Sequence, residues 1–175
     1  KVKNSRDKVK IALVGKYTAL HDAYISVNEA LKAAGWFYNK KVEINWVDSE
    51  TITRETAPEI LKDANGIIVP GGFGSRGIEG MLEAIRYARI NKVPYLGLCL
   101  GMQTAIIEFA RDVLNFPDAN SAEFNPGSMH PVIHLMPEQD GVTDIGGTLR
   151  LGAYPCILDK DSLAYQVYGT DRISE

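Results

Sequence analysis

The sequence predicts a doubly wound α/β domain on a mostly parallel β-sheet, with a small antiparallel extension toward its C-terminal end. Short runs of consecutive apolar residues, such as Gly66–Val69, alternate with longer segments whose apolar positions recur every three or four residues. Runs without polar alternation are typical of parallel strands that helices cover on both faces. After residue 120 the pattern changes to Gly- and Pro-rich loops with short strand-like runs, which indicates the antiparallel part.

The first half of the chain opens with a polar, basic stretch over 1–8, which we expect to be a linker or tail before one domain over 9–175. One expected helix, near 57–62, contains Pro58 in its first turn, where proline is tolerated. The expected elements are a strand over 10–14, a helix over 22–37 that starts near Asp22 and stops around Gly35, a strand over 42–47 and a short helix near 57–62.

The second half continues the alternation. The apolar run Gly66–Val69 ends in Pro70-Gly71-Gly72, which punctuates the chain before the next helical pattern. The further expected elements are a helix over 78–90, a strand over 93–98, a helix over 100–114 and short strands over 132–135, 148–151 and 156–158.

The composition is that of an ordinary globular domain, with 45% hydrophobic and 23% charged residues among 175. A net charge of −3 leaves no electrostatic footprint for nucleic acid or an anionic membrane. No segment approaches the ~20 apolar residues of a membrane span. Two cysteines suit a reducing compartment, so a cytoplasmic enzyme is the expectation.

The pentapeptide Gly97-Leu98-Cys99-Leu100-Gly101 lies between an apolar strand and a helical pattern. Small residues two positions before and after a nucleophile permit the sharp strand-to-helix turn of a nucleophile elbow, here with cysteine in place of serine. The helix N-terminus favours the thiolate of Cys99, and the N–H of Leu100 points to a developing oxyanion. The pattern predicts acyl transfer through a cysteinyl intermediate.

A lone cysteine after an apolar strand is more often a small buried hydrophobe, and only the two glycines favour the elbow. Cys156 has no such flanks in its strand-like stretch, so we expect a structural role for it.

The residues Gly72 to Gly77 match the G-x-G-x-x-G fingerprint of dinucleotide-binding proteins. That fingerprint also needs an acidic residue about 20 positions on, and Leu98 and Cys99 stand there instead. Because the carboxyl ends of neighbouring parallel strands share one sheet edge, we expect the glycine loop (residues 70–74) beside Cys99. The N–H of Gly72 would then be a second oxyanion donor.

Residues 97–103, Gly-Leu-Cys-Leu-Gly-Met-Gln, resemble the G-x-C-x-G-x-Q elbow of class I (triad-type) glutamine amidotransferases. Further stretches narrow the resemblance to the glutaminase domain of the CTP synthase family; they are residues 70–74, 76–80, 119–124 and 146–152. The resemblance implies a three-layer, flavodoxin-like fold.

It also implies that L-glutamine is hydrolysed through a cysteinyl thioester in this domain, with no cofactor or metal of its own. The ammonia would pass to an N-terminal synthetase domain, which uses ATP and Mg²⁺ to aminate UTP to CTP under activation by GTP. The resemblance further implies a homotetramer for the full-length protein. Another class I amidotransferase subunit and a non-catalytic binding module are the alternatives.

By the same resemblance, Cys99 is the nucleophile and the N–H groups of Gly72 and Leu100 stabilise the oxyanion. The α-amino and α-carboxylate groups of glutamine would be held by the backbone of Gly101 and Met102 with the side chains of Gln103 and Glu123. Glu123 could instead be a solvated loop residue, and Gln103 an ordinary helix residue. Phe73 would flank the site, whereas Arg150 could serve an interdomain contact or a salt bridge.

Two substitutions depart from the family, Ala122 for threonine and Leu149 for methionine, and neither removes a group that the chemistry needs. The family's His-x-Glu segment, which supplies the general base, does not occur in the 175 residues. We interpret His21, His130 and His134 as structural or surface residues, so the fragment alone is expected to have little or no glutaminase activity.

Overall fold

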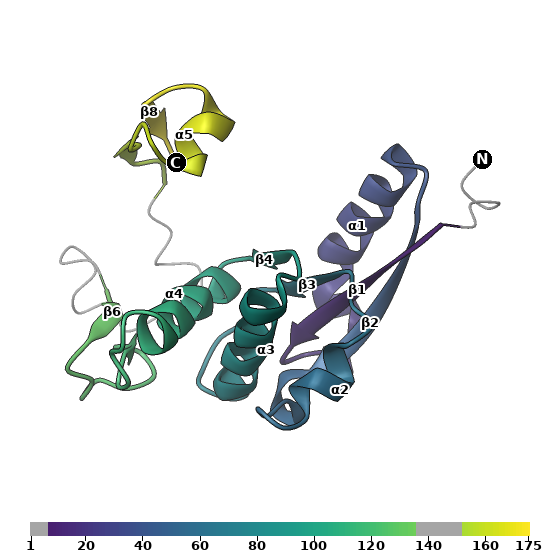
Figure 1. Ribbon diagram of the computed structural model, residues 1–175, viewed down its shortest axis with the longest axis horizontal. Coiled ribbons are helices and arrows are strands. Elements are labelled where there is room, and N and C mark those ends of the chain that lie inside the picture. Colours follow the sequence, from purple (N-terminus) through teal and green to yellow (C-terminus); the bar gives the residue numbers. More distant parts are fainter. Residues whose placement is uncertain (1–6, 136–151) are drawn as a thin grey trace. The chain divides into compact units, whose positions relative to one another are not determined.

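The computed structural model describes residues 7–135 and 152–175, which belong to two compact units, Lys1–His134 and Leu135–Glu175 (Figure 1). The first unit contains a four-stranded sheet whose strands are all parallel, in the order β2-β1-β3-β4. The strands are β1 (Lys8–Gly15), β2 (Lys41–Asp48), β3 (Gly66–Val69) and β4 (Tyr95–Gly97). Strand β1 takes in residue 8, the last residue of the expected linker.

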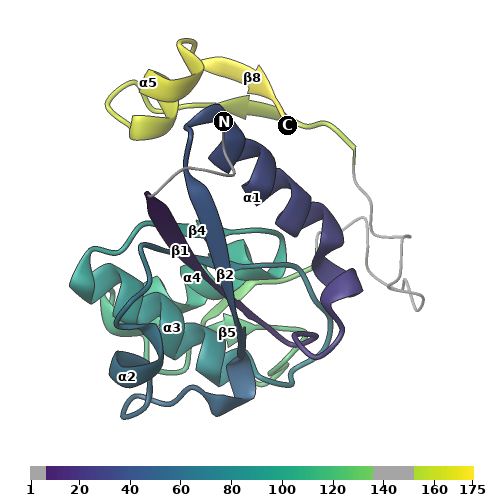
Figure 2. The same cartoon turned by 90° about the vertical axis from the view of Figure 1, so that its right-hand side faces the viewer.

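Four helices follow these strands in the chain: α1 (Ile25–Phe37), α2 (Ala57–Leu61), α3 (Ile78–Asn91) and α4 (Leu100–Asp112). The chain adds β2 on one side of β1 and β3 on the other, so right-handed crossovers place α1 and α2 on opposite faces. Figure 2 shows α1 on one side of β1 and β2, with α2 and α3 on the other. The predicted three-layer, doubly wound arrangement is confirmed.

The start of α1 differs from the prediction, whereas its end at Phe37 agrees with it. Its expected first turn is a separate 3₁₀ turn (His21–Tyr24), and the helix runs on through Gly35 to Phe37. Gly35 is buried against β2, where a Cβ would lie 2.7 Å from the side chain of Val42. This glycine therefore permits close helix–strand packing, and the chain turns at Asn39, whose φ is 52°.

The core lies between the sheet and helices α2, α3 and α4. It is formed by apolar side chains from these elements, among them Val14, Leu61, Ile67, Val69, Met81, Ala84, Leu100 and Ile107. Burying this set against the sheet fixes α4, and with it the elbow at its N-terminus.

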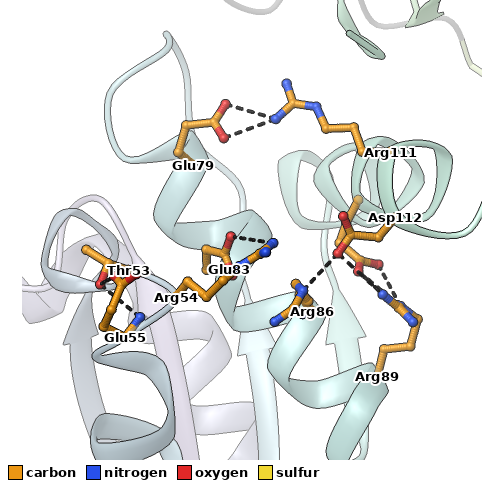
Figure 3. A network of polar contacts seen from close by, with 10 residues as sticks. Thr53, Arg54, Glu55, Glu79, Glu83, Arg86, Arg89, Arg111 and Asp112 are labelled. Atoms are coloured by element: carbon orange, nitrogen blue, oxygen red, sulfur yellow. Dashed lines mark hydrogen bonds and ion pairs between the residues drawn. The ribbon is translucent and has the colours of Figure 1, made fainter. Parts of the chain in front are cut away.

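A network of ion pairs joins α3 to α4 along their outer side (Figure 3). The guanidinium of Arg89 donates three bonds of 2.7–3.1 Å to the carboxylate of Glu108, which is only 3% exposed. Arg86 pairs with Asp112 at 3.0 Å, and Arg111 pairs with Glu79 at 3.0 Å. The network sets the position of α4 relative to α3.

Beyond α4, strands β5 (Asn120–Ser121) and β6 (Pro131–Ile133) form a pair that is parallel, not antiparallel as expected for this region. The loop between them reverses twice, with turns closed by the N–H of Asn125 on Ser121 and the N–H of Ser128 on Asn125. After the second reversal, β6 runs parallel to β5.

The second unit contains the antiparallel extension. Strand β7 (Pro155–Ile157) pairs antiparallel with β8 (Arg172–Ser174), a partner that the sequence pattern did not show. Helix α5 (Leu163–Tyr168) lies between them in sequence, capped by the Ser162 hydroxyl. The strand expected over 148–151 falls outside the described residues, as do Leu149 and Arg150.

Candidate active site

Cys99 stands between β4 and α4 as the N-cap of the helix, with an exposed side chain. Its backbone has φ 52° and ψ −106°, a region that residues with a Cβ rarely adopt. Such strain persists only where the surrounding structure imposes it, and it is typical of functional sites. The predicted elbow is therefore present, and it holds the thiol out of the core.

The two flanking glycines are required by packing. A Cβ on Gly97 would lie 2.6 Å from the backbone nitrogen of Met102, inside the first turn of α4. A Cβ on Gly101 would lie 2.9 Å from the carbonyl carbon of Val69 and closer still to its oxygen. The helix thus begins in direct backbone contact with both β4 and β3, which no larger residue would allow.

Hydrogen bonds from two side chains fix the first turn of α4. The Tyr95 hydroxyl donates to the carbonyl of Gly101 at 2.7 Å, and the Thr104 hydroxyl donates to that of Leu100 at 2.9 Å. Burial raises the pKa of Tyr95 far above its usual range, so this phenol stays a donor. Sequence reasoning missed both residues, which carry no motif.

The glycine loop lies beside the elbow, as the strand order predicted. The N–H of Leu98 donates to the carbonyl of Val69, the last residue of β3, at 2.9 Å. A Cβ on Gly71 would lie 3.6 Å from the Cβ of Cys99 and 4.0 Å from its sulfur. Leu100 is the first residue of α4, so its N–H has no intrahelical acceptor and is free for an anion.

Two of the other expected glutamine-binding residues, Met102 and Gln103, lie in the first turn of α4. Gln103 is half-buried one turn after Cys99, next to the exposed Met102. Glu123 is an exposed residue just after β5. Its backbone N–H donates to the Ser121 hydroxyl at 3.2 Å. Strands β5 and β6 pack on α4, so Glu123 belongs to the same part of the unit.

Lys16 is a polar residue at this edge that the sequence analysis did not single out. It follows β1 and is only 4% exposed, although lysine is almost never buried without partners. Its ammonium donates to the carbonyl of Phe73 at 3.0 Å and to that of Gly74. Phe73 itself is 66% exposed.

Two of the described histidines, His21 and His130, stack on aromatic rings that are not part of the elbow motif. His21 stacks on Trp46, and His130 stacks on Phe116. His130 also lies 2.5 Å from Asp118, a carboxylate twelve positions earlier that sequence spacing did not reveal. The contact between Asp118 and His130 joins the two ends of the loop that carries Glu123.

Within the described part of the chain, no three His, Cys, Asp or Glu residues gather in a potential metal site. Nor does any helix in that part combine the length and apolar content needed to cross a membrane. Cys156, expected to be structural, is exposed in β7.

Residues 19–173, which are most of the chain, match the protein family described as "Glutamine amidotransferase class-I". The chain belongs to the class-I glutamine amidotransferase family. A solved member of similar fold is the glutaminase domain of CTPS from Trypanosoma brucei with bound acivicin. The match has a TM-score of 0.80 and 35% sequence identity, over 95% of this chain and 65% of that one.

Curated relatives of this amidotransferase chain are named CTP synthase. Those from Clostridium beijerinckii and Halalkalibacterium halodurans are 57% and 59% identical over all 175 residues. The match covers 33% of each relative, so the chain spans about a third of their length. These relatives confirm the resemblance to the CTP synthase family that the elbow and glycine-loop residues indicated.

Proposed function

We propose that this chain is the glutamine-hydrolysing part of a CTP synthase, with Cys99 as its nucleophile. The observation that carries the proposal is the exposed thiol on a strained elbow at a helix N-terminus, with the glycine loop beside it. The sulfur is thus accessible to a substrate carbonyl carbon, and partial positive charge at the helix N-terminus faces the same place.

In the proposed reaction the sulfur of Cys99 bonds to the amide carbon of glutamine, and the N–H groups of Leu100 and Gly72 hold the resulting oxyanion. The carbon–nitrogen bond then breaks, and the proton that the thiol gave up ends on the leaving ammonia. Water hydrolyses the thioester, so that glutamine and water become glutamate and ammonia.

Four further residues form the proposed cradle for the amino-acid end of glutamine. Glu123 pairs with the ammonium group through a charge-assisted hydrogen bond. Gln103 and the backbone of Gly101 and Met102 bind near the carboxylate, at the first turn of α4, where the helix favours an anion.

The relatives' names and greater length support the rest of the proposal. In a cytoplasmic, homotetrameric protein, the residues before β1 would link this domain, residues 8–175, to a synthetase domain. That domain would use ATP and Mg²⁺ to aminate UTP with the released ammonia, and GTP would act as activator.

Labelling with acivicin, the ligand of the solved relative, tests the glutaminase proposal. Mass spectrometry should find Cys99 modified about 100-fold faster than the exposed Cys156, an internal reference for a simple thiol in the same sample. Glutamine should protect Cys99, whereas asparagine, which is one methylene shorter, should not. Equal rates at the two cysteines, without protection, would indicate a non-catalytic binding module instead.

A second experiment separates CTP synthesis from other amidotransferase reactions. The full-length protein that carries this chain should convert UTP to CTP with ATP and either glutamine or added ammonia. Cys99→Ala should abolish the glutamine-dependent reaction and leave the ammonia-dependent one. If neither nitrogen source aminates UTP, the chain serves another class I amidotransferase.

A further inference from the structure

We propose that Lys16 is a positioning residue that holds the glycine loop in the geometry needed for its oxyanion donor. The inference rests on the proposed function, because it concerns the loop that would bind the oxyanion. It assigns a role to a buried lysine outside the elbow, the glycine loop and the glutamine cradle.

The ammonium of Lys16 fixes two consecutive peptide planes. It donates to the carbonyl of Phe73 at 3.0 Å and to that of Gly74, the two residues that follow Gly72. These carbonyls are at an exposed loop tip, where nothing in regular secondary structure would hold them. The direction of the chain just after Gly72 is thus set by one side chain.

The aliphatic stem of Lys16 lies next to Gly72 itself. A Cβ on Gly72 would lie 3.4 Å from the Cδ atom of Lys16 and 3.4 Å from the Cδ2 atom of Leu100. Gly72 is therefore packed between the lysine stem and the first residue of α4. The two residues that carry the proposed oxyanion donors, Gly72 and Leu100, are therefore neighbours here.

The backbone of Lys16 is tied to the same loop from the other side. Arg76 donates to the carbonyl of Lys16 at 2.6 Å and also pairs with Glu50 at 2.6 Å. Residues 16 and 73–76 thus form a closed set of contacts between the end of β1 and the loop after β3. The loop cannot swing away from Cys99 without breaking them.

Lys16 also faces the segment that carries the glutamine cradle. Its ammonium lies 6.0 Å from the centre of the Phe124 ring, and the charge of Glu123 favours the ammonium form. Burial and the nearby Arg76 lower the pKa of Lys16 by more than Glu123 raises it. A buried cation with these partners is costly to build, which argues for a specific role at this position.

The test compares acivicin labelling of Cys99 in the whole chain and in Lys16→Met, which keeps the stem and removes the ammonium. We expect the labelling rate at saturating acivicin to fall about 10-fold to 100-fold, less than the roughly 100-fold to 1000-fold loss when an oxyanion donor is removed outright. The half-saturating concentration should change much less. Labelling of Cys99 by iodoacetamide, which needs no oxyanion donor, should be unchanged.

Lys10→Met is the matched control, since Lys10 lies on β1, the strand that leads to Lys16, and within the described residues its ammonium makes only an exposed contact of 3.4 Å with Asp63. If Lys16→Met does not fold, as judged by circular dichroism, Lys16→Gln provides the measurement, with the same expected loss. A saturating rate within about twofold of the unmodified chain in the folded variant would overturn the positioning role. Slow, unprotected labelling of the unmodified chain would instead overturn the proposed function.

Discussion

The α-carbon of Gly101 packs directly on the carbonyl group of Val69, so the helix that begins at the nucleophile touches the backbone of the neighbouring strand. A Cβ at this position would lie 2.9 Å from the carbonyl carbon of Val69 and 3.0 Å from its Cβ. The contact brings the end of β3, and with it the glycine loop, against the elbow. The geometry of the site therefore depends on the absence of one methyl group.

Gly101→Ala is expected to destabilise the chain by at least about 3 kcal/mol, because α4 must move away from β3 to admit the methyl group. The free energy of unfolding from urea denaturation measures this effect. Gly127→Ala is the matched control, since its Cβ would meet only Asn125 at 3.5 Å. It should change the stability by less than about 0.5 kcal/mol. Equal stability of the two variants would contradict the packing argument.

Tyr95→Phe removes the hydroxyl that donates to the carbonyl of Gly101. We expect a loss of about 1–2 kcal/mol in the free energy of unfolding, because that buried carbonyl loses a partner. Labelling of Cys99 by acivicin should also slow, as the first turn of α4 loosens. Tyr87→Phe is the control in α3, since the described residues include no partner for its hydroxyl. If both substitutions have the same effect, the hydroxyl of Tyr95 does not support the elbow.

Arg89→Met is expected to cost about 2–3 kcal/mol, because it leaves the carboxylate of Glu108 buried without its guanidinium. The value is below that of a fully buried pair, since the Arg89 side chain is 35% exposed. In a double-mutant cycle with Glu108→Leu, the second substitution should recover part of the loss. Arg54→Met, which breaks an exposed contact of 3.5 Å with Glu83, should cost less than about 0.5 kcal/mol. Additive losses in the cycle would exclude a coupled pair.

Asp118 gives the loop that carries Glu123 a dependence on pH. Its hydrogen bond with His130 holds the pKa of the Asp118 carboxyl below its usual range, while burial opposes the shift. A lowered pKa stabilises the fold above the unfolded value of about 4, and this contribution is lost as the pH falls through the lowered pKa. The difference in melting temperature between the chain and Asp118→Asn should thus shrink below about pH 4. Asp22→Asn, at an exposed carboxyl outside this contact, serves as control, and a difference that persists at low pH would exclude the linkage.

Glu123→Gln should weaken protection of Cys99 by glutamine about tenfold, because the amide cannot form a charge-assisted bond with the substrate ammonium. The measurement is the glutamine concentration that halves the rate of acivicin labelling. Glu43→Gln, at a half-buried carboxylate on β2 that pairs with Lys8, provides the control. Unchanged protection would indicate that Glu123 is a solvated loop residue.

Most of the sheet could be predicted from the sequence, because parallel strands buried on both faces leave unbroken apolar runs such as Gly66–Val69. The first turn of α1 was predicted wrongly, since residues 21–24 form a separate 3₁₀ turn, whereas its end at Phe37 agrees with the prediction. The orientation of β6 was also wrong, because two reversals inside one loop leave no periodic signal. Short strands are decided by such turns more than by their own residues.

The sequence by itself determined the elbow and the glycine loop, because sharp turns need particular residues at adjacent positions and those residues can be read in order. The tertiary structure alone decided that Lys16 reaches Phe73, that Tyr95 supports Gly101 and that Asp118 holds His130. Two of these pairs join residues that are distant along the chain, and none has a fixed spacing. Their contacts follow from which strands and loops lie side by side, which is set by burial of the whole core.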